Sequence, residues 1–169
     1  DNDSQSVKNN EEEEYFDEPE KIDIDSENDK LRTTGENESY ICQLIRNDSI
    51  DDFMQYVNDQ KINLSSSILT SLFETNPYIL KNKIVLIEYA AFFGSFKIFK
   101  YLFDCKVGLP SSLWFCAIHG QNYDIINLLD ENNIEPEDLT YKSYYNESIK
   151  CHHNDIAIFI SELIANEEE

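Results

Sequence analysis

Two short segments hold the side chains best suited to metal chemistry. Cys116 and His119 lie three residues apart, and Cys151-His152-His153 follows farther along the chain. Cys and His at positions i and i+3 of a helix share one face, so two such segments could supply the four ligands of a tetrahedral zinc site. The paired Cys-x-x-Cys or His-x-x-x-His spacing of such sites is missing. Cys116 lies in an apolar helical pattern and residues 151–153 fall at a polar turn, so we expect no metal and no cofactor.

The sequence also lacks the patterns typical of catalytic sites. It contains no nucleophile elbow, no His-Glu-x-x-His pair and no glycine-rich loop that could bind phosphate, and it has only 4 glycines. We therefore predict a protein that is not an enzyme and has no small-molecule substrate. The alternative is a small helical metal-binding protein or hydrolase that uses His119, His152 and His153 together with Cys116 or Cys151.

The charge distribution divides the chain into an arm and a folded part. Residues 1–38 carry 15 acidic and 4 basic side chains and few large apolar ones. Such a segment buries too little apolar surface to offset the entropy lost on ordering, so we predict a disordered acidic arm over 1–38. This arm could attract a basic partner, or it could serve only to keep the protein in solution.

The net charge of −21 over the whole chain limits the choice of partner. Nucleic-acid affinity depends on basic side chains at the phosphates, and an anionic membrane surface attracts the same side chains. We therefore expect neither ligand. The four cysteines are widely spaced within apolar patterns, which favours reduced thiols and an intracellular, cytoplasmic location.

The helices that must position the candidate Cys and His side chains are predicted from residue 39 onward. Short amphipathic segments alternate with Asn, Asp, Ser, Gly or Pro, and none shows the alternation of a half-buried strand. This predicts an all-α domain over 39–166. Its units are predicted at 39–59, 84–105, 110–133 and 143–166. The segment 60–83 between the first two units is predicted to hold an inserted helix near 65–75 and a turn at Pro77. The predicted helices cover 39–47, 49–59, 65–75, 84–93, 95–104, 110–119, 122–132, 143–151 and 154–166.

The last three units repeat one another. The segment 97–102 aligns with 124–129 at an offset of 27 and with 155–160 after a further 31 residues. Each copy has apolar residues at i and i+4, which give its second helix one stripe to bury against a neighbour. In the helix before it, one position stays small (Ala90, Ala117, Ser148), as the close approach of stacked helix pairs requires.

The segment from Glu88 to Leu102 resembles an ankyrin repeat. Ala90-Ala91, Gly94, Ile98 and Leu102 match the positions of that family at the end of the inner helix, the turn and the outer helix. The Thr-Pro-Leu-His opening is replaced in every unit, and the offsets of 27 and 31 fall short of about 33 residues. The chain is thus similar to divergent ankyrin repeats, which implies a helix-turn-helix stack, or α-solenoid. The alternative is a different helical stack or bundle in which the repeat register is accidental.

The resemblance implies a scaffold that binds a partner protein, of a kind the sequence does not specify, through its concave face. The positions that it assigns to the partner are the exposed sites between helices and, with less support, the shortened loop tips. They are Phe92, Phe93, His119, Lys150 and Cys151, followed by Lys106, Glu137, Asp138 and Lys142.

Overall fold

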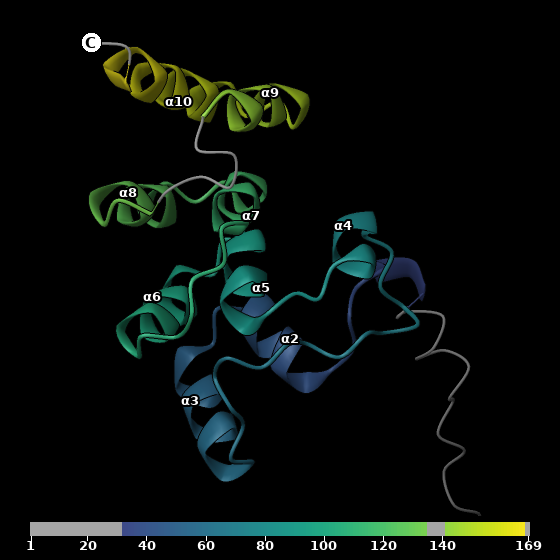
Figure 1. Ribbon diagram of the computed structural model, residues 1–169. Coiled ribbons are helices and arrows are strands. Elements are labelled where there is room, and N and C mark those ends of the chain that lie inside the picture. The colour runs from purple at the N-terminus through teal and green to yellow at the C-terminus, as the bar shows by residue number, and fades with distance from the viewer. Residues whose placement is uncertain (1–31, 135–140, 168–169) are drawn as a thin grey trace, which may run out of the picture.

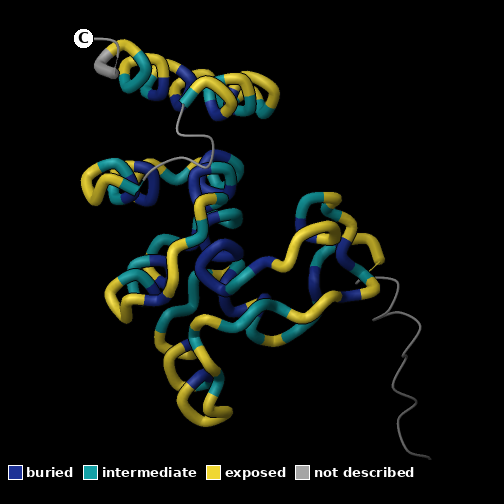
Figure 2. Tube along the Cα trace, viewed as in Figure 1, coloured by how far each residue is buried: buried dark blue, intermediate teal, exposed yellow. Residues whose placement is uncertain are grey.

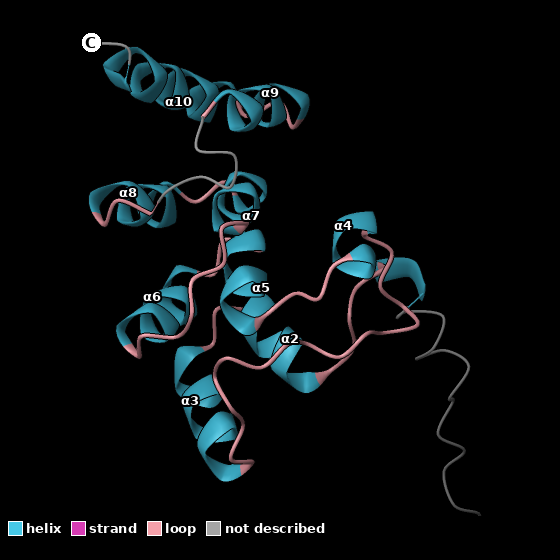
Figure 3. Cartoon of the chain, in the orientation of Figure 1, coloured by secondary structure: helices cyan, strands magenta, loops and turns pink. Residues whose placement is uncertain are grey.

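The computed structural model describes residues 32–134 and 141–167, and their regular structure is helical apart from one isolated bridge between Ser67 and Val85 (Figure 3). The prediction of an all-helical fold is confirmed. The helices are α2 (Tyr40–Arg46), α3 (Ile50–Asp59), α4 (Pro77–Lys81), α5 (Leu86–Phe92), α6 (Phe96–Asp104), α7 (Leu113–Gly120), α8 (Tyr123–Glu131), α9 (Lys142–Lys150) and α10 (Asn154–Glu167).

Consecutive helices pack in pairs, and the pairs pack on one another. The pairs are α2 with α3, α5 with α6, α7 with α8 and α9 with α10. The first helices of the pairs contact each other in the order α2, α5, α7, α9, and we call them the inner layer (Figure 1). The second helices α3, α6 and α8 also contact each other in order. Every predicted helix outside 60–83 therefore has a counterpart within a few residues of its expected bounds.

The apolar pairs at i and i+4 lie in the core, as the sequence predicts. Their members are 0–1% exposed: Ile98 and Leu102 in α6, Ile125 and Leu129 in α8, Ile156 and Ile160 in α10. Burying one such side chain contributes roughly 1.5–3 kcal/mol. Figure 2 shows that buried residues gather where the helices face one another and that exposed residues lie on the outward sides.

The inner layer packs closely because its contact residues are small. Ala90, Ala117 and Ser148 are all 0% exposed. The backbones come close together where α5 and α7 end, since a Cβ added to Gly120 would lie 2.0 Å from the carbonyl oxygen of Ala91. The backbones of these two helix ends are thus in direct contact, and a side chain at this point would separate them.

Polar side chains at the turns join one helix pair to the next. The carboxylate of Asp48, in the turn after α2, accepts hydrogen bonds from the amides of Lys97 and Ile98 at 3.1 and 3.0 Å, and so caps the first turn of α6. The side chain of Asn122 caps α8 and donates to the carbonyl of Gly94 at 2.9 Å. Each cap satisfies amides that the helix leaves unpaired and fixes a neighbouring pair at the same time.

The prediction for segment 60–83 is wrong. Residues 65–75 form no helix, and α4 begins at Pro77, where the sequence analysis placed a turn. Asn76 accepts hydrogen bonds from the amides of Tyr78 and Ile79, and proline is favoured at the first helical position after such a cap. Upstream, the amide of Ile68 donates to the carbonyl of Ile84, so this backbone pairs with another segment rather than within a helix.

The folded part also begins before the predicted boundary at residue 39. The amide of Thr75 donates to the carbonyl of Gly35 at 2.9 Å, and the Asn37 side chain donates to the carbonyl of Leu69 at 2.7 Å. Asn37 is 1% exposed. The inserted segment provides these partners, so residues 35–38 belong to the fold rather than to the acidic arm. Residues 32–34, also assigned to the predicted disordered arm, are helical. The rest of that predicted arm up to residue 31, and Glu137 and Asp138, lie outside the described residues.

Candidate functional site

Three of the predicted partner-binding positions are equivalent in the repeat and lie on neighbouring inner helices. Phe92, His119 and Lys150 are related by the offsets of 27 and 31, and they stand at or near the ends of α5, α7 and α9. The ring of Phe92 stacks on that of His119, with centroids 5.0 Å apart and planes 12° from parallel. The inner layer thus brings residues from different repeats into one cluster.

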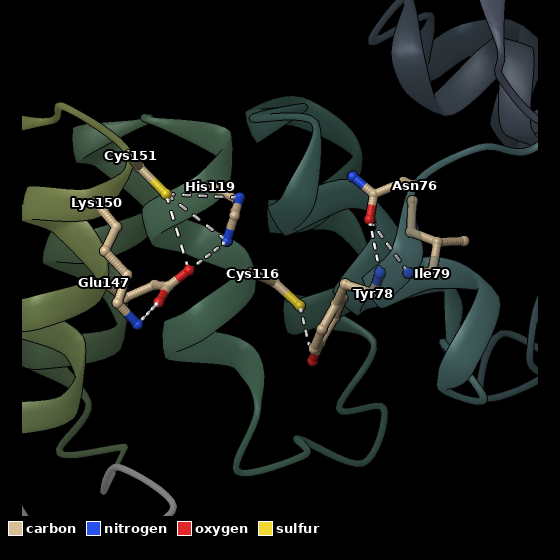
Figure 4. A network of polar contacts seen from close by, with 8 residues as sticks. All are labelled: Asn76, Tyr78, Ile79, Cys116, His119, Glu147, Lys150 and Cys151. Atoms are coloured by element: carbon tan, nitrogen blue, oxygen red, sulfur yellow. Dashed lines mark hydrogen bonds and ion pairs between the residues drawn. The ribbon is translucent and has the colours of Figure 1, made fainter.

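A polar network continues from His119 onto α9 (Figure 4). His119 Nε2 lies 3.3 Å from Glu147 Oε1, and the other carboxylate oxygen of Glu147 accepts a hydrogen bond from Lys150 Nζ at 3.1 Å. Cys151 Sγ lies 3.8 Å from His119 Nε2 and 4.0 Å from Glu147 Oε1. Imidazole, thiol and carboxylate therefore face one another across the contact between α7 and α9.

Burial shifts the protonation of two members of this network. Desolvation lowers the pKa of His119, although the nearby carboxylate of Glu147 opposes the shift. Desolvation also raises the pKa of the Cys151 thiol, and Glu147 adds to that shift. Near neutral pH the network therefore holds a neutral imidazole and a protonated thiol, which is a poor arrangement for a cysteine nucleophile because the thiolate is the reactive form.

Phe93 differs from Phe92 in what it contacts. Its ring lies 4.6 Å from that of Tyr89, and the Arg46 guanidinium stands 5.9 Å above it. Phe92 and Phe93 are both half-buried and pack against the core. The two phenylalanines therefore line the edge of the inner layer and also help to hold it together.

The inserted segment lies on the inner layer, which the sequence did not reveal. Tyr78 of α4 packs against Phe115 with ring centroids 4.3 Å apart, and against Phe92 at 6.0 Å. Its hydroxyl lies 3.8 Å from Cys116 Sγ. Burial raises the pKa of the Tyr78 hydroxyl and, together with the charge of Glu88, raises that of Cys116 to about 12. Tyr78 thereby forms one wall of the surface beside α7.

A pocket of about 470 Å³ opens between this wall and α9. Its floor and sides combine aromatic rings with polar and charged side chains, which suits a partner group that is partly apolar and partly hydrogen-bonding. The lining residues are Tyr78, Phe115, Ser143, Tyr144, Asn146, Glu147 and Lys150.

The remaining predicted positions lie apart from the polar network. Lys106 is exposed at the end of α6, and Lys142 is exposed at the start of α9. The metal site weighed from the sequence is not assembled as proposed, because Cys116 faces Tyr78 and His152 is exposed. Glu147 was missed, although it precedes Cys151 by four residues and so shares its helix face.

Comparisons with protein-family models, with curated proteins and with solved structures give no match. In the part of the chain that the structure describes, no helix combines the length and apolar character that crossing a membrane requires.

Proposed function

We propose that this chain is a non-enzymatic, ankyrin-like repeat scaffold that binds a partner protein on its inner layer. The observation that carries the proposal is the pocket of about 470 Å³ beside α9, which is lined by aromatic and charged side chains. A pocket already formed in the free protein can accept a partner side chain at little cost in ordering, which favours binding.

The repeat positions support the ankyrin-like part of the proposal. Ala90, Ala117 and Ser148 are equivalent in the sequence, and all three are buried between helices. Phe92 and His119 are equivalent to each other two residues after Ala90 and Ala117, and their rings are in contact. A stack of this kind repeats the same surface position on each inner helix, so a binding face can extend along the row.

The charge of the chain bears on the choice of partner. A protein with a net charge of −21 attracts basic partners over a distance and repels nucleic acid and anionic lipid. Lys150 and Glu147 place both signs of charge in the lining of the pocket. We infer a protein segment that presents an apolar side chain to the pocket and basic groups around it.

A bulky substitution in the pocket tests this function. Asn146 lines the pocket and is exposed, so Asn146→Trp fills the space without removing a core contact. Asn127→Trp is the matched control, since Asn127 is exposed on α8 in the other layer. The full chain and both variants are cross-linked in lysate of the source cells, and captured proteins are quantified by mass spectrometry.

The proposal predicts a set of proteins captured by the unmodified chain and by Asn127→Trp but reduced about tenfold or more with Asn146→Trp. Each such protein is then prepared pure, and its Kd for the three forms is measured. Equal capture of every protein by Asn146→Trp and Asn127→Trp would remove the pocket as the binding site.

A further inference from the structure

The contact between α7 and α9 gathers three chemically different metal-binding groups. Within the described residues, His119, Glu147 and Cys151 form a group whose ligand atoms all lie within 4.8 Å of one another. His119 comes from α7, Glu147 from α9 and Cys151 from the residue that caps α9 (Figure 4). All three side chains are half-buried, so an ion could reach them while remaining partly shielded from water.

We propose that His119, Glu147 and Cys151 bind one Zn²⁺ ion, a role that goes beyond partner binding. Zinc bonds of about 2.0 Å to nitrogen and oxygen and 2.3 Å to sulfur place tetrahedral ligands about 3.3 Å apart for nitrogen and oxygen. With sulfur in the pair the separation is about 3.5 Å. The observed separations are 3.3 Å for His119 and Glu147, 3.8 Å for Cys151 and His119, and 4.0 Å for Cys151 and Glu147.

The adjustments that zinc would require are small. The distances from Cys151 Sγ to His119 Nε2 and to Glu147 Oε1 must shorten by a few tenths of an ångström to match a tetrahedral zinc site. Cys151 Sγ is nearly equidistant from the two ring nitrogens of His119, at 3.8 and 3.9 Å, so the imidazole must also rotate to point one lone pair at the ion. Both changes are side-chain motions that leave α7 and α9 in place.

The surroundings favour the ligand form of His119 and orient Glu147. The rings of Phe92 and Phe115 lie against His119 at 5.0 and 4.6 Å, and this apolar contact keeps the imidazole neutral, as metal binding requires. Lys150 donates a hydrogen bond to one carboxylate oxygen of Glu147, and the other oxygen faces His119. On binding, the Cys151 thiol becomes a thiolate bonded to zinc, and its proton passes to solvent.

We expect a water molecule in the fourth coordination position. Of the three ligands, Glu147 also lines the pocket of about 470 Å³. Three protein ligands and one water are an established arrangement for zinc. Thiolate and carboxylate together balance the charge of the ion, so the bound state adds little net charge to the half-buried site.

Metal titration of the full, untagged chain tests this site. After removal of bound metal with a chelator, Zn²⁺ affinity is measured by competition with a chromophoric chelator, and Co²⁺ is used as a spectroscopic substitute. The ligand variants are Cys151→Ser, Cys151→Ala and His119→Gln. The matched controls are Cys105→Ser, which changes an exposed thiol, and His152→Asn, which changes an exposed imidazole and keeps a residue type tolerated at its φ of 59°.

We expect one Zn²⁺ per chain, and a Co²⁺ complex with thiolate-to-metal charge transfer in the near ultraviolet. Each ligand variant should lose at least about 100-fold in Zn²⁺ affinity, the cysteine variants should lose the charge-transfer band, and the controls should keep both. Zinc should raise the Tm of the unmodified chain but not that of a ligand variant relative to its own metal-free form. Absence of stoichiometric zinc, unchanged affinity in the ligand variants, or loss of binding in His152→Asn would each overturn the proposal.

Discussion

Replacing Gly120 with alanine should destabilise the protein strongly, although alanine is the better helix former. Gly120 is the last residue of α7, where an added Cβ would lie 2.0 Å from the carbonyl oxygen of Ala91 and 2.7 Å from the amide nitrogen of Gly94. A Cβ atom essentially never lies within 3.0 Å of another heavy atom outside its own chain neighbours, and both atoms met here are backbone, so no side-chain rotation can relieve the clash. The helices α5 and α7 must move apart.

The cost of the backbone clash exceeds the gain in helix propensity, so the free energy of unfolding should fall. Alanine gains at most about 1 kcal/mol over glycine from helix propensity. Overpacking a well-filled contact costs typically about 1–3 kcal/mol, and a clash with fixed backbone lies at the upper end of that range. We expect a net loss of about 2 kcal/mol or more in the free energy of unfolding, which corresponds to a fall in Tm of roughly 5–10 °C for a domain of this size.

Thermal and urea unfolding of the full chain, followed by circular dichroism, measures this loss. Gly108→Ala is the matched control, because a Cβ added to Gly108 meets nothing within 4 Å. That control should be neutral or slightly stabilising, through its effect on the unfolded chain. If Gly120→Ala is as stable as Gly108→Ala, the close backbone contact between α5 and α7 does not exist and the packing described for the inner layer is wrong.

Three further outcomes follow from caps and cysteines. Asn122→Ala should lower the free energy of unfolding, measured by urea titration, by about 1–2 kcal/mol, because it removes the α8 cap and the hydrogen bond to the carbonyl of Gly94. The control Asn132→Ala changes an exposed residue at the end of α8 and should lower it by less than about 0.5 kcal/mol. The pKa of Cys116 is about 12 in the folded protein against 9.0 for a free thiol, so the unfolded state loses its proton first and stability falls as pH rises above 9. That loss is on the order of 1 kcal/mol at pH 10, so Cys116→Val should lose less stability than the unmodified chain between pH 8 and pH 10. A thiol reagent should label exposed Cys105 in the native protein but buried Cys42 only on unfolding, and equal labelling rates by mass spectrometry would contradict the burial.

Where sequence reasoning succeeded, a strong local pattern agreed with the tertiary structure. Paired apolar residues such as Ile125 and Leu129 predicted which face of each second helix is buried, and the repeat offsets located the small residues between inner helices. The segment 60–83 lacked such a pattern. Its backbone is held by distant partners, including Gly35 and Ile84, and hydrogen bonds of that kind leave no periodic trace in the sequence. Pro77 carried a usable signal that was interpreted as a break rather than a helix start.

The site was predictable only in part, for a related reason. The resemblance selected Phe92, His119 and Lys150 as candidates, and in the structure they lie on the neighbouring helices α5, α7 and α9. Glu147 could have been found from its spacing with Cys151 along one helix face. Tyr78 could not, since its place against Phe115 depends on how the inserted segment crosses the inner layer, and only the folded structure reveals that path.

Nuclear Overhauser spectra of the full chain test the central claim, that α5, α7 and α9 form one continuous layer. The structure places the rings of Phe92 and His119 with centroids 5.0 Å apart and the sulfur of Cys151 3.8 Å from His119. The account predicts cross-peaks from the His119 ring protons both to the Phe92 ring and to the Cys151 β-protons. Assigned spectra in which His119 shows cross-peaks only to residues of its own helix would contradict it.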